Sequence, residues 1–316
     1  MRRLLAAALV GLACAAAHAQ DYPTRTIKII VPFPPGGGMD GIARPLAEKL
    51  AGLLGQPVVT ENRPGASGNV GAEAMARTPA DGYTLMFAND FLATNPAMYK
   101  SIGYDSLKDF APVARAATVK MLFVVHPSFG AKTFRDLVQM SKSKPVSLGT
   151  PGVGSVPHLL GELLNLENAI RTIHIPYKGS GPAVADVLGG QVDVILTTVP
   201  SVVSPVRAGK LRVLAVTSEK RSDALPDAPT LAESGVQGVA SEIWYGLFAR
   251  GGTPEPVLRR LQAATAQALA QPDLIERLQK TGYEMAPLSP DAFGAQLRAD
   301  LARWQRVVAD AKIPKE

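Results

Sequence analysis

The chain of 316 residues is poor in the side chains that build disulfides and metal centres. It has one cysteine, Cys14, and four histidines. Cys14 lies inside an apolar N-terminal segment, so the chain beyond that segment has no thiol for a disulfide or for nucleophilic chemistry. His126, His158 and His174 are dispersed and lack the spacing of a metal site. We therefore expect neither disulfides nor a metal, and no other cofactor is indicated.

Sequence signatures of nucleotide binding and of serine hydrolysis are also missing. The turn at Gly152 and Gly154 continues with Pro157 where a dinucleotide fingerprint has its third glycine. No Gly-Lys pair is followed by the serine or threonine of a phosphate loop. A catalytic triad built from distant residues stays open on this basis, but no residue pattern indicates one. Three serines near glycines lack the Gly-x-Ser-x-Gly elbow of many hydrolases: Ser67, Ser155 and Ser180.

Charged residues make up only 19% of the chain, and no dense cluster of Lys and Arg with interleaved aromatics occurs. Nucleic acid is therefore not an expected partner. Beyond the N-terminal segment, no apolar stretch is long and uncharged enough to span a membrane. The net charge of +6 falls to +4 if Arg2 and Arg3 leave with a leader, since 31 basic residues then face 27 acidic ones. Such an excess implies at most a mild attraction for anions.

Residues 1–19 have the three parts of a secretory signal peptide. Met1-Arg2-Arg3 is the basic start, an apolar run extends from Leu4 to Ala17, and Ala17-His18-Ala19 is a small-x-small cleavage site. We expect cleavage directly after this site, with an N-terminal core helix as the alternative. Gly11-Leu12-Ala13-Cys14 loosely resembles a lipoprotein cleavage box, so lipidation of this cysteine is a further alternative to simple secretion.

Short apolar segments alternate with helical periodicity, which indicates an α/β fold with mainly parallel sheets. A helix ending before Gly55 carries Ile42, Leu46, Leu50 and Leu54 on one face. From Pro254 onward we expect only helices. The predicted strands are continuous and apolar or β-branched, as strands covered on both faces are. They cover residues 27–32, 58–61, 84–87, 122–125, 146–149, 172–175, 192–196 and 211–217.

The length of the chain after the leader suits two domains. No low-complexity linker separates them, so we expect the chain to cross between two lobes through ordered segments. We place these two crossover segments near residues 112–120 and 239–247. One lobe then comprises residues 20–115 and 246–316, with the tail helices. The other comprises residues 116–245, and a ligand cleft lies between them.

Two glycine-rich turns, each predicted between a strand and a helix, are the most informative features of the chain. The first turn covers residues 31–40 around Gly36, Gly37 and Gly38, and the second covers residues 149–155. Unpaired N–H groups and the positive end of the dipole at such helix starts suit a carboxylate or phosphate. Two turns so far apart in the chain predict one cleft lined from two sides.

Side chains near the second turn add candidate ligand contacts. Ser155 and His158 are placed to give side-chain hydrogen bonds, with helix capping and a surface position as their respective alternatives. Tyr177-Lys178-Gly179 follows a predicted strand at a carboxyl edge, where open α/β sheets bind ligands.

Six segments of the chain, in order, resemble the Bug-type extracytoplasmic receptors, the substrate-binding proteins of tripartite tricarboxylate transporters. Each motif alone is weak, but the six together extend over nearly the whole chain after the leader. They are residues 32–37, 65–72, 104–110, 149–155 with His158, 176–182, and 225–230 with Glu233.

The resemblance implies a two-lobed, periplasmic-binding-protein-like receptor in the periplasm, without enzymatic activity. It closes on a small organic acid, and the two turns hold the carboxylate through backbone amides, hydroxyls and ordered waters. Its partners would be the membrane permease subunits of such a transporter. By matching motif, the implied binding positions are Phe33, Pro35, Gly36, Gly37, Thr150, Gly154, Ser155, His158 and Tyr177.

The chain departs from the family pattern near two predicted strand ends. Thr197 stands where the family often has an aspartate, which weakens the case for an amino acid as ligand. Asn89 and Asp90 follow another strand, and Asp90 would either replace that charge or pair with Lys or Arg, of which we favour pairing.

Two other functions stay open at this point. A loaded receptor could dock on a sensor protein instead of a permease, and a secreted serine hydrolase could use Ser155 and His158. The ligand itself is not predicted: di- and tricarboxylates, aromatic acids, nicotinate-like rings and amino acids all remain. We expect a monomer.

Overall fold

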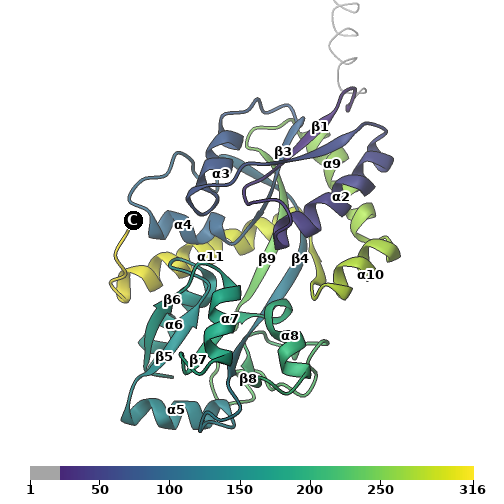
Figure 1. Cartoon of the computed structure of the whole chain (residues 1–316). Coiled ribbons are helices and arrows are strands. Elements are labelled where there is room, and N and C mark those ends of the chain that lie inside the picture. The colour runs from purple at the N-terminus through teal and green to yellow at the C-terminus, as the bar shows by residue number, and fades with distance from the viewer. Residues whose placement is uncertain (1–21) are drawn as a thin grey trace, which may run out of the picture.

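The computed structural model describes residues 22–316, which form two lobes stacked one above the other in Figure 1. The predicted signal peptide at residues 1–19 and Cys14 lie outside the described residues. None of the helices in the described part of the chain is both long and apolar enough to cross a membrane.

The upper lobe is built on a parallel three-stranded unit. β1 (Ile27–Val31) lies between β2 (Val58–Asn62) and β3 (Thr84–Asn89) and pairs in parallel with both. The predicted stripe of Ile42, Leu46, Leu50 and Leu54 is buried, and that helix ends at Gly55, whose φ of 69° suits glycine. The helices that follow the strands are α2 (Gly38–Leu54), the short η2 (Ala66–Gly68) with α3 (Asn69–Ala76), and α4 (Phe91–Met98).

The lower lobe repeats this alternation of strand and helix. β5 (Val146–Thr150) lies between β6 (Thr172–Pro176) and β7 (Val194–Thr198) and pairs in parallel with both. Thr133 and Asp136 form a capping box at the start of the first helix. The remaining elements are α5 (Phe134–Ser143), α6 (Val156–Leu166), α7 (Ser180–Leu188), α8 (Val199–Arg207) and β8 (Arg212–Val216).

Two long strands connect the lobes. β4 (Phe110–Val125) and β9 (Glu242–Arg250) pair antiparallel along most of their length. β9 also pairs with β3, while the far end of β4 pairs with β7 and β8. One sheet results, with the order β2-β1-β3-β9-β4-β7-β5-β6. The predicted class, two α/β lobes joined by two ordered segments, is confirmed, whereas the residue boundaries of the lobes stay a prediction.

The prediction of the sheet needs one correction. The sheet is mixed and not mainly parallel, because both crossing strands run antiparallel to their neighbours. β4 begins at Phe110, so the predicted crossover at 112–120 and the predicted strand at 122–125 form one continuous strand. Its first half is rich in alanine and its pairing with β9 shifts register twice, so no continuous β-branched run marks it.

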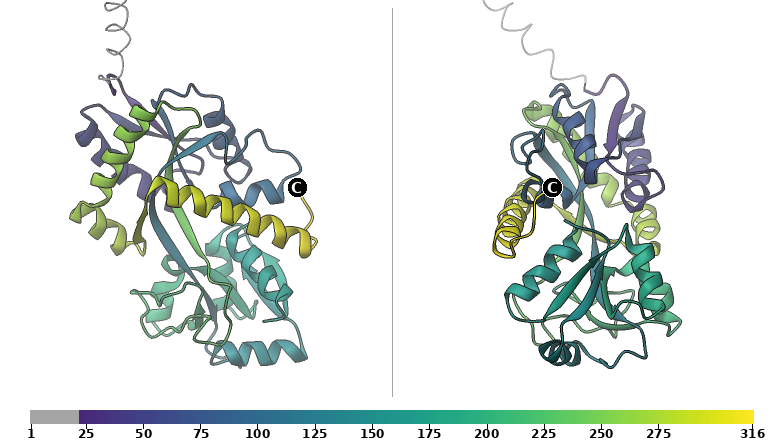
Figure 2. Two further views of the ribbon diagram at one scale, coloured as in Figure 1. Left: turned by 180° about the vertical axis from the view of Figure 1, so that it is seen from behind. Right: turned by 60° about the vertical axis from the view of Figure 1, so that its left-hand side comes forward.

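The prediction that the tail beyond Pro254 is purely helical is wrong. β10 (Glu284–Leu288) pairs antiparallel with β4. This strand is short and has no β-branched residue, so the sequence carries little signal for it. α9 (Glu255–Leu269) and α10 (Pro272–Lys280) cover the upper lobe beside α2. α11 (Pro290–Asp310) lies across the back of the molecule against α4, β4 and α6 (Figure 2). Its predicted cap, Ser289, accepts a hydrogen bond from the N–H of Ala292.

Candidate functional site

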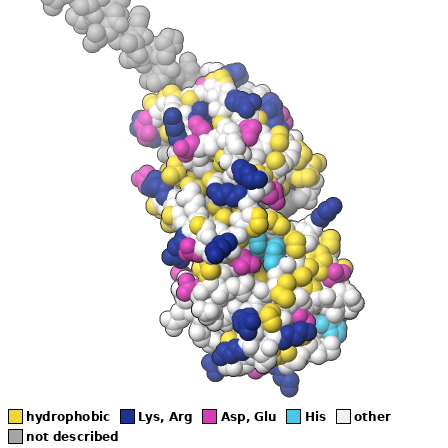
Figure 3. All heavy atoms as spheres, turned by 90° about the vertical axis from the view of Figure 1, so that its left-hand side faces the viewer, with side chains coloured by type: hydrophobic (Ala, Val, Ile, Leu, Met, Phe, Trp, Pro, Cys, Tyr) yellow, Lys and Arg dark blue, Asp and Glu magenta, His cyan; other side chains and the backbone are white. Residues whose placement is uncertain are grey.

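A cavity of about 640 Å³ lies between the two lobes. Val119 of β4 and Ile243 of β9 contribute from the crossing strands. On the face that carries α4 and α6, hydrophobic and histidine side chains gather where the lobes meet (Figure 3). The upper lobe contributes Phe33, Gly38, Ser67, Asn89, Asp90, Phe91, Thr94, Asn95, Met98 and Tyr99, and the lower lobe contributes residues 151–157, Ser180, Thr198, Pro200 and Ser201.

The starts of five α-helices converge on this cavity. The first N–H groups of a helix have no partner within the helix, and the helix dipole makes that end positive. Such a convergence favours a ligand with negatively charged oxygen atoms. The residues at these starts that line the cavity are Gly38 of α2, Phe91 of α4, Val156 of α6, Ser180 of α7 and Thr198, the cap of α8.

Among the described residues that line the cavity, no lysine, arginine or histidine occurs. A bound anion would therefore be held by backbone N–H groups and by hydroxyls such as those of Ser67, Ser180 and Ser201. Within residues 22–316, no group of three or more His, Cys, Asp or Glu side chains is arranged to hold a metal ion.

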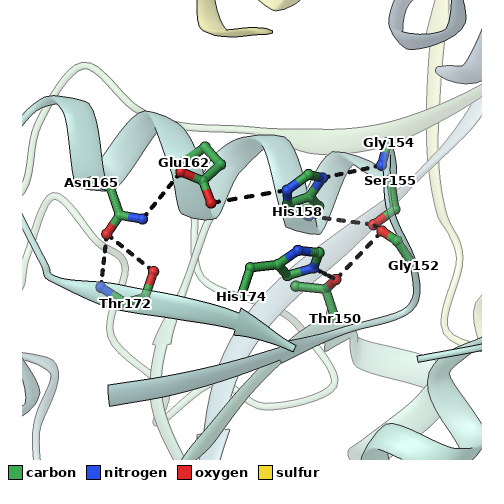
Figure 4. A network of polar contacts seen from close by, with 9 residues as sticks. All are labelled: Thr150, Gly152, Gly154, Ser155, His158, Glu162, Asn165, Thr172 and His174. Carbon is green, nitrogen blue, oxygen red and sulfur yellow. Dashed lines mark hydrogen bonds and ion pairs between the residues drawn. The ribbon is translucent and has the colours of Figure 1, made fainter. Parts of the chain in front are cut away.

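The second glycine turn is held in shape by Ser155, the cap of α6 (Figure 4). The Ser155 hydroxyl donates to the Gly152 carbonyl at 2.7 Å and accepts from the backbone N–H of His158 at 3.3 Å. Capping, the alternative role for this serine, is therefore present. Gly154 and Ser155 both line the cavity as well.

His158 lies behind the turn and does not line the cavity. Its Nδ1 accepts the N–H of Gly154 at 3.1 Å, and its ring stacks on His174 at 3.8 Å between centroids. The Thr150 hydroxyl lies 2.6 Å from Nε2 of His174 (Figure 4). Burial, together with His174, lowers the pKa of His158 to about 3, and burial lowers the pKa of His174 to about 4. Both rings are neutral near pH 7 and support the turn through packing and hydrogen bonds.

The same hydrogen bonds decide whether His158 can act as the base for a nucleophilic Ser155. Because Nδ1 of His158 already accepts the Gly154 N–H, that nitrogen is not free to take a proton from Ser155. The proton of the neutral ring then lies on Nε2, which is directed toward Glu162 at 3.9 Å. The pair is arranged as a structural support and not as a nucleophile with its base.

The first glycine turn contacts the cavity only at its two ends. Phe33 and Gly38 line the cavity, and the Phe33 ring meets Phe91 edge to face at 5.9 Å. Pro35, Gly36 and Gly37 are exposed and lie outside the lining.

A polar network fixes the first turn from the start of α2. The Gly36 N–H donates to the buried Asp40 carboxylate at 3.0 Å, and Arg44 Nε donates to the same oxygen at 2.7 Å. Burial opposes ionisation, but hydrogen bonds from Arg44, Gly36 and Asn62 outweigh it and hold the pKa of Asp40 below its usual range.

Asp90 lines the cavity, but its carboxyl group is directed to the crossing strand β9. Oδ2 of Asp90 accepts the backbone N–H of Trp244 on β9 at 2.9 Å, and the Trp244 indole donates to Asp300 at 2.9 Å. A backbone N–H, and not the favoured Lys or Arg, is thus its hydrogen-bond partner. Burial and then Asp300 raise the pKa of Asp90 well above its usual value. Asn89 also lines the cavity and accepts the Phe91 N–H at 3.3 Å.

Three further predicted residues lie behind the lining. Thr150 is fully buried beside His174. Thr197 is fully buried and donates to the hydroxyl of Ser180, which does line the cavity, at 3.0 Å. Tyr177 donates its hydroxyl to Asp186 at 2.8 Å. The structure places five of the predicted site residues in the cavity lining: Phe33, Asn89, Asp90, Gly154 and Ser155. That any predicted site residue contacts a ligand stays a prediction.

Several lining residues were missed by the sequence analysis. Thr198 and Ser201 flank the start of α8 directly after a strand, and this capping pattern could have indicated them. Tyr245 and Tyr283 meet edge to face at 5.6 Å beside Gly38 but come from β9 and the segment before β10. No local pattern in the sequence links those two tyrosines.

Comparison with known proteins identifies the family. Residues 42–313 match the family described as the tripartite tricarboxylate transporter family receptor. The chain belongs to this receptor family. Protein BugT of Bordetella pertussis is 37% identical over 319 residues, which cover 98% of each chain. The resemblance to Bug-type receptors is confirmed, and the receptors of this family are periplasmic solute-binding proteins.

Two related solved structures share the fold and contain an acid. Rpa4515 of R. palustris with adipate is 34% identical, with a TM-score of 0.80, and the match covers 94% of this chain and all of that one. MatC of Rhodopseudomonas palustris with bound malate is 31% identical, with a TM-score of 0.76, over 91% of this chain and all of that one. Both of those ligands are dicarboxylates.

Proposed function

We propose that the chain is a periplasmic receptor that captures a small organic acid as its carboxylate and delivers it to the permease of a tripartite tricarboxylate-type transporter. One observation carries the proposal: the starts of five α-helices meet in a cavity that has no cationic side chain among the described residues. The first N–H groups of a helix have no partner within the helix, and the dipole gives that end a partial positive charge.

This arrangement suits reversible capture of a carboxylate. Backbone N–H groups hold an anion in a fixed geometry without a buried ion pair, whose desolvation cost often cancels its Coulombic gain. Two acidic residues line the cavity, Asp90 and Glu316, and the Asp90 carboxyl group is engaged by the backbone N–H of Trp244. The adipate and malate in the two related structures support an acid without an amino group.

Capture would proceed by closure of the two lobes, which we assign to residues 20–115 with 246–316 and to residues 116–245. A ligand that touches both walls favours the closed state by its differential contacts. We assign secretion to the leader at residues 1–19, a monomeric state in the periplasm, and no catalytic step.

A thermal-shift screen of residues 20–316 against small carboxylic acids and their amides tests this function. One acid should raise the melting temperature with concentration while its amide does not, since a ligand at a hundred times its Kd stabilises by about 2.7 kcal/mol. No stabilisation by any acid, in protein that native mass spectrometry shows to be free of retained ligand, would overturn the proposal.

A further inference from the structure

Two glycines of the chain touch the opposite lobe. Gly154 lies in the turn before α6, and a Cβ atom at this position would lie 3.2 Å from Cγ of Met98, which ends α4. Gly282 lies between α10 and β10, and a Cβ atom there would lie 2.8 Å from Cγ of Pro200 in the first turn of α8. Each contact joins an element of the upper lobe to one of the lower lobe.

The two contacts lie at the two ends of the cavity. Met98, Gly154 and Pro200 all line it, and Gly282 directly precedes Tyr283, which also lines it. In Figure 1, α4 and α6 lie on one side of the crossing strands, while α8 and α10 lie on the other. The lobes are therefore in contact through a glycine on each side of the ligand space.

An added Cβ at Gly282 would clash with Pro200, and one at Gly154 would be tight against Met98. Gly154 and Gly282 have φ values of 72° and 85°, where glycine is free of the Cβ strain that other residues meet. Pro200 is a ring fixed near the start of α8, so it cannot turn aside as a flexible side chain would. In a close-packed contact of this kind, an added methyl group must move the two sides apart.

We propose that Gly154 and Gly282 set how closely the two lobes approach each other across the cavity, and thereby the length of acid that the receptor selects. The proposal rests on the proposed function. A methyl group at either glycine holds the lobes apart at that end, so a short acid no longer touches both walls. A longer acid still spans the wider space and loses less of its binding.

The experiment measures Kd by calorimetry for straight-chain dicarboxylic acids from succinate to suberate in wild type and Gly282→Ala. For the shortest acid that binds wild type, the variant should raise Kd about tenfold, as when the closed fraction falls to roughly a tenth. The longest acid should lose clearly less affinity, so the chain length of the acid that binds best increases. Gly154→Ala should act in the same direction but less, because Met98 is flexible.

Matched controls separate the contact from backbone strain. Gly252 has a φ of 86°, and a Cβ there would meet only Ala80 Cβ, at 3.8 Å. Gly209 has a φ of 70° and nothing within 4 Å of such a Cβ. Gly252→Ala and Gly209→Ala carry the same backbone strain as the test variants. They should leave the length profile, meaning the dependence of Kd on the chain length of the acid, unchanged.

A second variant keeps the proposal falsifiable. Pro200→Ala removes the Cγ that the new methyl group meets, so the double variant with Gly282→Ala should recover much of the short-acid binding. If Gly282→Ala has the length profile of Gly252→Ala, the proposal is wrong while the receptor function stands. If wild type binds none of these acids, the proposal is also wrong, and the thermal-shift screen alone decides the function.

Discussion

The two glycine-rich turns face the same cavity but are held in different ways. The first turn is exposed and is fixed by charged groups: the Asp40 carboxylate accepts hydrogen bonds from Gly36 and Arg44. The second turn is fixed by neutral ones, since Gly154 donates to a buried imidazole that stacks on a second imidazole.

The difference shows that one backbone geometry, a glycine turn at a helix start, tolerates two kinds of support. A charged support at the surface is screened by salt, whereas a buried neutral support depends on packing and on staying unprotonated. The two turns should therefore respond differently to mutation, pH and salt.

The largest effect should follow removal of the neutral support. His158→Ala leaves the Gly154 N–H without its acceptor and empties the space of the ring against His174. We expect a loss of about 2–4 kcal/mol in the free energy of unfolding, from the cavity and the unpaired group together. Urea unfolding with an unchanged m-value measures it.

His126→Ala is the control for this variant, because the His126 ring bonds only to Ser128 beside it. This change should cost less than about 1 kcal/mol. Equal losses for the two variants would show that the imidazole stack does not support the second turn.

A decrease in pH should act selectively on the second turn. The pKa values of His158 and His174 are lowered by folding, to about 3 and about 4, so between these values and 6.5 the unfolded chain binds more protons. Stability is therefore full above about pH 6.5 and falls as the pH drops toward 4, by at most about 1.4 kcal/mol per pH unit for each ring.

The first turn should not contribute over most of this window. The pKa of Asp40 is lowered, so its contribution is present above the ordinary pKa of an aspartate and is lost only as the pH falls below it. Unfolding measured from pH 7 to 4.5 in wild type and in His158→Asn with His174→Phe tests this. A double variant with the same slope as wild type would contradict the assignment.

The smallest effect should come from the charged support. Asp40→Asn removes the ion pair with Arg44, whose side chain is 45% exposed, and weakens the acceptor for Gly36. We expect a loss of about 1 kcal/mol that shrinks in high salt. Unfolding at low and high salt measures it; a salt-independent loss would mean that Asp40 acts through packing and not through charge.

Much of this architecture could be predicted from local patterns. The stripe of α2, the cap at Ser289 and both glycine turns follow from spacing and residue type, because each depends on neighbours in the chain. The continuity of β4 from Phe110 to Val125 and the strand β10 could not be found in this way. Their alanine, proline and methionine residues become strand only through pairing across the sheet.

The sequence indicated the two turns of the candidate site but not the contacts between residues that lie far apart in the chain. The motif at residues 149–155 indicated the second turn. The position of His158 behind that turn depends on its stacking against His174, which lies on β6. Tyr245 and Tyr283 meet only after the chain has crossed between the lobes. Such contacts are fixed by packing and leave no spacing signal in the sequence.

The place of β9 in the sheet has a consequence for the order of folding. β9 lies between β3 and β4, which both precede it by more than a hundred residues, so the centre of the sheet stays incomplete until nearly the whole chain is present. Pairings so distant in sequence slow folding, because loop closure must precede the contacts that stabilise it. A growing chain of this kind remains without its central strand for most of its synthesis.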